Sequence, residues 1–139
     1  MIRTATRSDL PAVVDLENLS FAEPWDLRTF RSYVHHPGFI VFDEDGSICG
    51  YVILVVIADD AHLASIAIHP KHRRRNIGSC LLDSCMLLAK TNSFPLVRLE
   101  VREKNKTAQD FYLANGFEAV AIIPDYYPDD NAIVMERRT

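Results

Sequence analysis

Residues 65–79 read SIAIHPKHRRRNIGS, which combines an apolar strand, a proline, a basic run and the start of a helix. We expect a strand over His62–His69 that Pro70 ends, and a helix over Ile77–Thr91. The first turn of a helix has backbone N–H groups without intrahelical partners and carries the positive end of the helix dipole. The segment therefore predicts an anion site, flanked by the basic side chains of Lys71–Arg75.

The rest of the chain predicts strands and helices on both sides of this segment. Upstream, we expect a strand over Met1–Thr6, a helix capped by Ser8, a helix capped by Asp26, and a hairpin of strands over Gly38–Asp43 and Ser47–Ala58. Downstream, we expect a strand over Leu96–Val101, a helix over Lys106–Asn115 ended by Gly116, and strands over Phe117–Ile123 and Ala132–Glu136 separated by a loop at Pro124–Asn131. The helix between two of these strands is the type of crossover that joins parallel strands, so the order predicts a mixed α/β fold.

Length, composition and charge limit the class of protein. The chain has 139 residues, 48% of them hydrophobic and 24% charged, as expected for one globular domain over residues 1–139. Its net charge of −4 argues against a general nucleic-acid binder. Its apolar runs are shorter than the roughly 18 residues of a membrane helix, so we expect no membrane partner. The N-terminal sequence MIRTATRSDL lacks the apolar core of a signal peptide, which predicts a cytoplasmic protein.

The cysteines and histidines show no pattern of a metal site. Cys49, Cys80 and Cys85 lack metal-ligand spacing and lie among apolar residues, so we expect small core residues. The adjacent pair His35-His36 belongs to no recognisable ligand set. Since no cysteine is accompanied by an activating histidine, we expect neither a metal nor a cysteine nucleophile.

The basic loop contains the pattern Arg73-x-x-Asn76-x-Gly78. It matches neither the P-loop nor the dinucleotide-binding glycine motif. It resembles the Gln/Arg-x-x-Gly-x-Gly/Ala pattern of the GCN5-related N-acetyltransferases, the GNAT family, with Asn76 in place of a glycine. Asparagine tolerates left-handed backbone better than most residues, so we expect the loop to keep its shape. The alternative is a solvated basic loop that only caps a helix.

A longer resemblance covers the second half of the chain. Residues 99–105 (LEVREKN), with Tyr112 and Asn115-Gly116-Phe117 after them, are similar to the LEVR..N..A...Y...GF signature of the RimI-type branch, the ribosomal-protein alanine N-acetyltransferases. Pro24-Trp25 and residues 125–128 (DYYP) also agree with that branch. The resemblance spans nearly the whole chain. It implies a single GNAT domain with a central mixed, mostly antiparallel sheet of about seven strands, about four helices, and a splayed parallel strand pair that forms the acetyl-CoA cleft.

The same resemblance implies roles for individual residues. Glu100 takes the position of the general base and Tyr112 that of the general acid for the departing CoA thiolate. The implied cofactor contacts are Ile66, Ala67 and Ile68 in the strand, Arg73, Arg74, Arg75, Asn76, Ile77, Gly78 and Ser79 in the loop and helix start, and Asn105. The implied substrate contacts are Glu23, Pro24, Trp25, Tyr126 and Tyr127, in a groove between their two loops.

Each of these roles has a structural alternative. Arg98, Glu100 and Arg102 share one face of the expected strand, where they would also form an Arg–Glu–Arg ion cluster that lowers the pKa of Glu100. Tyr112 is alternatively a core residue, and Asn105 is alternatively a helix N-cap. The Glu23–Trp25 segment is alternatively an ordinary surface loop with an aromatic anchor.

These patterns together predict an acetyl-CoA-dependent N-acetyltransferase. The resemblance implies an acceptor at the N-terminal α-amine of a protein, a ribosomal protein in the RimI-type branch, with direct attack in a ternary complex and CoA as product. A small-molecule amine or a lysine side chain is the alternative acceptor; lysine has a pKa of about 10.4 and demands more of the base. Two competing functions are a non-catalytic CoA-binding module and RNA binding through Arg73–Arg75. The oligomeric state is left open.

Overall fold

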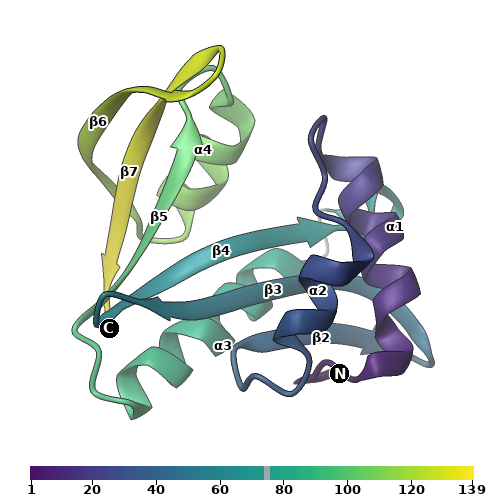
Figure 1. Cartoon of the computed structure of the whole chain (residues 1–139). Helices are drawn as coiled ribbons and strands as arrows, with labels where there is room; N and C mark the ends of the chain where they lie inside the picture. Colours follow the sequence, from purple (N-terminus) through teal and green to yellow (C-terminus); the bar gives the residue numbers. More distant parts are fainter. Residues whose placement is uncertain (74–75) are drawn as a thin grey trace. The chain divides into compact units, whose positions relative to one another are not determined.

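A computed structural model describes residues 1–73 and 76–139 (Figure 1). In chain order the elements are β1 (Ile2–Thr4), η1 (Arg7–Asp9), α1 (Leu10–Ser20), α2 (Leu27–Tyr33), β2 (Phe39–Glu44), β3 (Ser47–Ile57), β4 (Asp60–Ile68), η2 (Pro70–His72), α3 (Ile77–Thr91), β5 (Leu96–Arg102), α4 (Lys106–Ala114), β6 (Glu118–Tyr127) and β7 (Asp130–Arg138). The seven strands follow the order β1-β2-β3-β4-β5-β7-β6 in one sheet. The predicted mixed α/β fold is confirmed.

The chain divides into two compact units. Unit 1 comprises Met1–Val55 and Ala64–Cys85, and unit 2 comprises Val56–Leu63 and Met86–Thr139. Strands β3 and β4 and helix α3 therefore contribute residues to both units. Within the described ranges, no helix is long and apolar enough to cross a membrane.

The strands of unit 1 present two apolar faces. One buried cluster joins Phe39, Val41, Tyr51, Ile53 and Ala67 of the strands to Leu10, Val13 and Leu16 of α1 and Phe30 of α2. Helices α1 and α2 cover this face, and the first part of α3 covers the other (Figure 1). On the α3 side, a Cβ added to Gly50 would lie 2.7 Å from Ile68 Cδ1 and 3.2 Å from Leu81 Cδ1. Gly50 therefore lets α3 pack close to the sheet.

The start of α1 differs from the prediction that Ser8 caps it. The short helix η1 precedes α1, and Thr6 and Asp9 form a capping box. The Asp9 carboxylate accepts hydrogen bonds from the Thr6 N–H at 2.7 Å and from two guanidinium nitrogens of Arg3 at 2.7 and 2.8 Å. The Arg3 guanidinium lowers the pKa of Asp9. The predicted cap of α2 is confirmed, since Thr29 N–H donates to Asp26 Oδ1 at 2.9 Å.

Unit 2 contains the predicted parallel strand pair. Ala61 pairs with Val97 and His62 with Arg98 in parallel register, whereas β7 is antiparallel to both β5 and β6. Strand β5 alternates between buried and half-buried residues, with Val97, Leu99 and Val101 buried and Arg98, Glu100 and Arg102 half-buried, as predicted. Helix α4 begins where the Asn105 side chain accepts from Ala108 N–H at 3.1 Å, and Gly116 follows it with φ of 88°.

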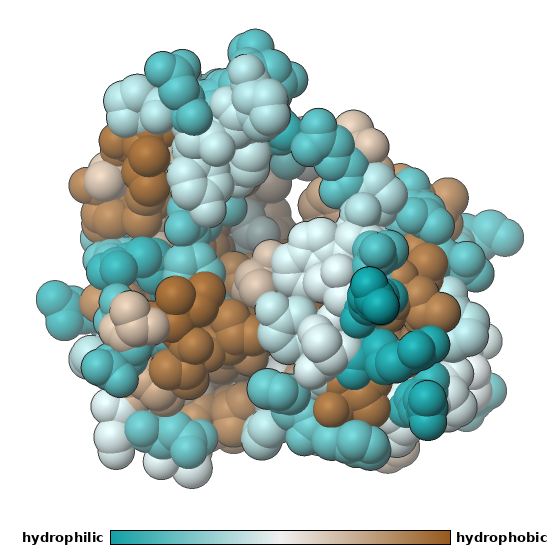
Figure 2. Space-filling model, in the orientation of Figure 1, coloured by the Kyte–Doolittle hydropathy of each residue, from teal (hydrophilic) through white to brown (hydrophobic). Residues whose placement is uncertain are grey.

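The predicted loop over Pro124–Asn131 is wrong, because β6 continues through Tyr127. The register of β6 against β7 shifts between Ile123 and Tyr127, and pairing resumes at Tyr127 and Asp130. Asp125 occupies this irregularity with φ of 53°, and its N–H donates to Asn131 Oδ1 at 2.9 Å. Strand β6 is an exposed edge strand, and Figure 2 shows apolar surface over it at the upper left.

Candidate active site

The Glu100 carboxylate extends from the half-buried face of β5 and contacts a histidine of β4. His62 Nε2 lies 2.6 Å from Glu100 Oε2, and the two side chains are 18% and 16% exposed. The parallel register places His62 level with Arg98, so its ring reaches the next residue on the same face of β5. His62 was not among the predicted site residues.

The two arginines that flank Glu100 have carboxylate partners of their own. Arg98 Nε donates to Glu136 Oε2 at 2.8 Å, and Arg102 forms an ion pair with Asp129. The positive charges of the two arginines are therefore paired with Glu136 and Asp129 rather than with Glu100 alone. The sequence predicts an Arg–Glu–Arg cluster on the half-buried face of β5. The structure has a Glu–His pair there, between two arginine ion pairs.

Two tyrosines of β6 lie close enough to Glu100 for its charge to affect their pKa values. The rings of Tyr126 and Tyr127 meet edge to face with centroids 4.9 Å apart, and the Arg102 guanidinium lies 4.3 Å from the centre of the Tyr127 ring. Burial raises the pKa of both phenols, and the negative charge of Glu100 adds to the rise. Both hydroxyls are therefore protonated at neutral pH and can donate hydrogen bonds.

Tyr112 is a core residue of unit 2, as its structural alternative predicts. Its ring packs against Phe117 and Phe111, with centroids 5.7 and 5.4 Å away. Burial raises the pKa of Tyr112 well above its ordinary value, and Tyr127 adds to the rise. The hydroxyl therefore stays protonated and can give its proton only to a strong base. A thiolate that is equally buried is such a base, because burial also raises the pKa of a thiol. Cys85 is an example, since burial raises its pKa to about 12.

The predicted cofactor strand lies in unit 1, in the second half of β4. Ala67 belongs to the buried cluster beneath α1 and α2, whereas Ile66 and Ile68 are half-buried on the opposite face. The strand end is tied to the loop after it, because Arg73 Nε donates to the Ile68 carbonyl at 3.4 Å.

The start of α3 has the backbone shape that the motif predicts. Asn76 has φ of 60°, in the left-handed region, and its carbonyl accepts from Cys80 N–H at 3.0 Å. Asparagine thus adopts the conformation for which the family pattern has glycine. Ile77 and Gly78 are buried and Ser79 is half-buried in the first turn. Arg74 and Arg75 lie outside the described residues.

A buried glutamate of α1 holds the segment that precedes α2. Glu17 is 2% exposed, and its carboxylate accepts hydrogen bonds from the Tyr51 hydroxyl, from the Ser65 hydroxyl at 3.3 Å and from Trp25 N–H at 3.0 Å. The Tyr51 and Ser65 hydroxyls also contact each other at 3.0 Å. Glu17 was not predicted, because its position on the buried side of a helix resembles that of a core residue.

The Trp25 ring is anchored on α2. It stacks on Tyr33 with centroids 5.9 Å apart and is tilted against Phe30 at 5.4 Å. Glu23 and Pro24 before it are exposed. The aromatic-anchor description of this loop is therefore confirmed, and contact with a substrate remains a prediction for all three residues.

The sheet topology and these groups define the class of protein. The backbone N–H groups at the start of a helix that follows a strand can bind anions. A half-buried carboxylate beside protonated phenols can support proton transfer. Both features are typical of an acyltransferase. The chain belongs to the acetyltransferase (GNAT) family, whose family model matches residues 10–117.

Individual relatives support the same assignment. The ribosomal protein bS18-alanine N-acetyltransferase of Escherichia coli is 30% identical over 140 residues, which cover 96% of this chain and 94% of that protein. The crystal structure of the ribosomal-protein-S18-alanine N-acetyltransferase from Escherichia coli superimposes with a TM-score of 0.86 at 28% identity, over 99% of this chain and 92% of that one. Ard1 from Thermoplasma volcanium gives a TM-score of 0.93 at 29% identity, over 100% and 97%. The predicted RimI-type resemblance and the predicted enzyme class are confirmed.

Proposed function

We propose that this protein, acting as one domain over residues 1–139, transfers the acetyl group of acetyl-CoA to the N-terminal α-amine of a protein. The observation that carries the proposal is the contact of 2.6 Å between Glu100 and His62 beside two protonated tyrosines. The relative that acts on the alanine of a ribosomal protein supports an N-terminal acceptor, and we propose a ribosomal protein as the substrate. Such an acceptor would be met in the cytoplasm, the location that the sequence predicts.

Glu100 is the proposed general base. An α-ammonium with a pKa of about 7.7–8.0 is mostly protonated at neutral pH and must lose a proton before it attacks a thioester. Glu100 Oε2 is engaged by His62 Nε2, which leaves Oε1 to accept that proton, directly or through one water. His62 is then a positioning residue, because its contact with Oε2 holds the orientation of the carboxylate.

Tyr112 is the proposed general acid. As the amine nitrogen bonds to the acetyl carbon, the carbon–sulfur bond breaks and the sulfur takes the phenolic proton of Tyr112. Its raised pKa suits this role only if the thiolate is equally desolvated. We further propose that the backbone N–H groups of Ile66, Ala67 and Ile68 stabilise the oxyanion and pair with the pantetheine arm.

The cofactor phosphates are assigned to the start of α3. Its 15-residue length provides a full dipole, and we propose that the N–H groups of Asn76, Ile77, Gly78 and Ser79 bind phosphate oxygens, with charge from Arg73, Arg74 and Arg75. Asn105 caps α4 through its side-chain oxygen, so its NH₂ group is the part proposed to contact the cofactor. We propose no metal ion for the acetyl transfer.

The acceptor side is assigned to the segment before α2 and to the end of β6. We propose that Trp25, Tyr126 and Tyr127 contact the acceptor backbone, with Glu23 and Pro24 beside Trp25. The exposed Glu23 carboxylate would attract the positive charge of the acceptor N-terminus.

Mass spectrometry of peptides incubated with enzyme and acetyl-CoA tests the proposal. We expect acetylation at the α-amine of peptides that begin with alanine, and no modification of matched peptides with a blocked N-terminus and internal lysines. Acetylation of lysine alone, or of small amines alone, would replace the proposed acceptor. Tight CoA binding without turnover of any amine would instead support a non-catalytic module.

A further inference from the structure

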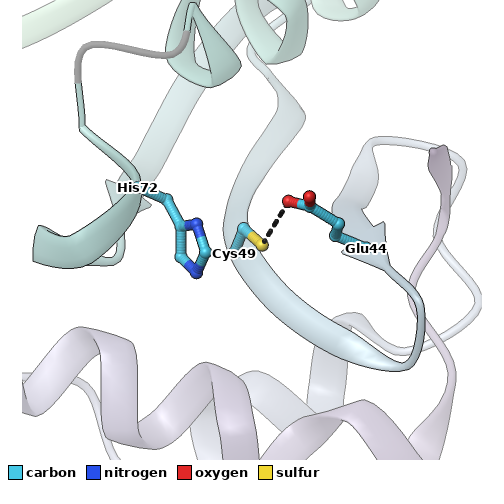
Figure 3. Close-up of side chains that lie close together, drawn as sticks. All are labelled: Glu44, Cys49 and His72. Atoms are coloured by element: carbon cyan, nitrogen blue, oxygen red, sulfur yellow. Dashed lines mark hydrogen bonds between the residues drawn. The ribbon is translucent and has the colours of Figure 1, made fainter.

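Three side chains of unit 1 that the proposed acetyl transfer does not use lie together near the hairpin of β2 and β3 (Figure 3). They are the Glu44 carboxylate on β2, the Cys49 thiol on β3 and the His72 imidazole on η2, and their ligand atoms all lie within 4.8 Å of one another. Cys49 is buried, and Glu44 and His72 are half-buried. The prediction that no histidine accompanies a cysteine is therefore wrong for Cys49. The core prediction is also wrong for Cys80, which is exposed.

The backbone holds this Glu44–Cys49–His72 cluster in place. The register of the hairpin shifts between Phe42 and Asp43, which makes Cys49 the extra residue of a β-bulge. Bulges redirect side chains and are common beside functional sites. The Cys49 carbonyl accepts from His69 N–H at 2.8 Å, and the His69 carbonyl accepts from His72 N–H at 2.8 Å. Two backbone hydrogen bonds therefore connect the thiol-bearing residue to the imidazole-bearing one.

The distance between the Cys49 thiol and the Glu44 carboxylate fits a tetrahedral zinc ion. Zinc binds sulfur at about 2.3 Å and carboxylate oxygen at about 2.0–2.2 Å, so at the tetrahedral angle these two ligands lie about 3.6 Å apart. Cys49 Sγ and Glu44 Oε2 are 3.6 Å apart. In Figure 3 the His72 ring faces the thiol from the side opposite the carboxylate. We propose that Glu44, Cys49 and His72 bind one zinc ion, with water as the fourth ligand.

Charge and proton balance favour this occupant. The ion replaces the thiol proton of Cys49, which leaves as H⁺ while the zinc–sulfur bond forms, and no electron is transferred. A thiolate, a carboxylate and a neutral imidazole cancel the double positive charge, which removes the cost of burying a net charge. Sulfur, nitrogen and oxygen from three different residues form a donor set that suits zinc better than magnesium or calcium.

The ion would have a structural role. Helix η2 leads directly into Arg73, so zinc would tie the segment before the basic loop to the β2–β3 hairpin. The site does not depend on the proposed acceptor or on the base, and acetyl transfer can fail without affecting it.

Cobalt(II) is the first probe, added to the metal-free full-length protein. We expect one equivalent to produce a thiolate-to-cobalt charge-transfer band and visible bands of tetrahedral cobalt, all lost when zinc is added. Cys49→Ser should abolish the charge-transfer band, and His72→Gln should weaken zinc binding at least tenfold. Zinc at about a hundred times its Kd should raise the Tm by roughly 5–10 °C.

Two matched variants control for adventitious binding. Cys80→Ser removes an exposed thiol and His36→Gln an exposed imidazole outside the cluster, and neither should change the cobalt spectrum or the zinc affinity. A charge-transfer band that persists in Cys49→Ser, or disappears in Cys80→Ser, would overturn the proposal. So would the absence of stoichiometric cobalt binding by the folded wild-type protein. If Cys49→Ser fails to fold by circular dichroism, His72→Gln decides, and an unchanged zinc affinity then refutes the site.

Discussion

Replacement of Glu100 by glutamine tests the proposed base most directly. The change keeps the shape of the side chain and a polar group in contact with His62, but removes the charge that accepts a proton. A positioned general base contributes about 10²–10⁴-fold to a rate. We expect kcat to fall about 10³-fold, which corresponds to about 4 kcal/mol of transition-state stabilisation.

Loss of folding does not account for a change of this size. The Glu100 and His62 side chains form one half-buried contact of 2.6 Å. Such a contact contributes about 1 kcal/mol to the free energy of unfolding after solvent screening. The variant should therefore remain folded at assay temperature.

The assay measures CoA release with an alanine-initiated peptide between pH 6 and pH 9. Without a base, only the free amine reacts, so below the amine pKa of about 7.7–8.0 the rate of Glu100→Gln should fall tenfold for each pH unit. The wild-type rate should fall less steeply. The control is Glu136→Gln, which removes a half-buried carboxylate of the same unit that pairs with Arg98. Wild-type kcat and pH profile in Glu100→Gln, or an equal loss in Glu136→Gln, would place the base elsewhere.

Three further substitutions test the acid, the phosphate site and the first helix. Tyr112→Phe should lower kcat at least tenfold and leave the Kd of acetyl-CoA unchanged, because only the proton donor is lost; unaltered turnover removes its role. Arg73→Ala should weaken acetyl-CoA binding about tenfold by calorimetry, through one charge-assisted hydrogen bond, and an equal loss for pantetheine without phosphates would contradict the assignment. Asp9→Asn should lower the free energy of unfolding by about 2 kcal/mol in urea titrations at pH 7, because the two bonds from Arg3 lose their charge. Folding lowers the pKa of Asp9, so this stability is complete above the unfolded pKa of about 3.9 and is lost as the pH falls through the folded pKa. The Asp9→Asn variant should lack this loss of stability in acid. A variant whose stability falls with pH as the wild type's does would refute the role of Asp9.

Local pattern accounts for much of the fold. The bounds of α3, Ile77–Thr91, were predicted because its apolar residues recur at helical spacing between a loop and a polar end. The alternation of β5 was predicted because successive side chains of a strand face opposite sides. The left-handed backbone of Asn76 and Gly116 also follows from residue type.

The errors arose where a contact with another element decides the local structure. Asp9 rather than Ser8 organises the start of α1, because Arg3 of β1 binds its carboxylate. Strand β6 extends to Tyr127 because Asp130 of β7 pairs with it there. The residue types between Ile123 and Tyr127 do not predict that the strand continues past a register shift.

For the site, the sequence alone determined the residue types and suggested the base and acid, Glu100 and Tyr112, because the family motif places both within one short stretch of the chain. Only the tertiary structure decided their neighbours. His62 reaches Glu100 through the register of two strands separated by a crossover helix, and His72 reaches Cys49 through a bulge and two backbone hydrogen bonds. Contacts of this kind depend on register and packing between distant segments, and a one-residue shift of either strand would turn the same side chains to the opposite face.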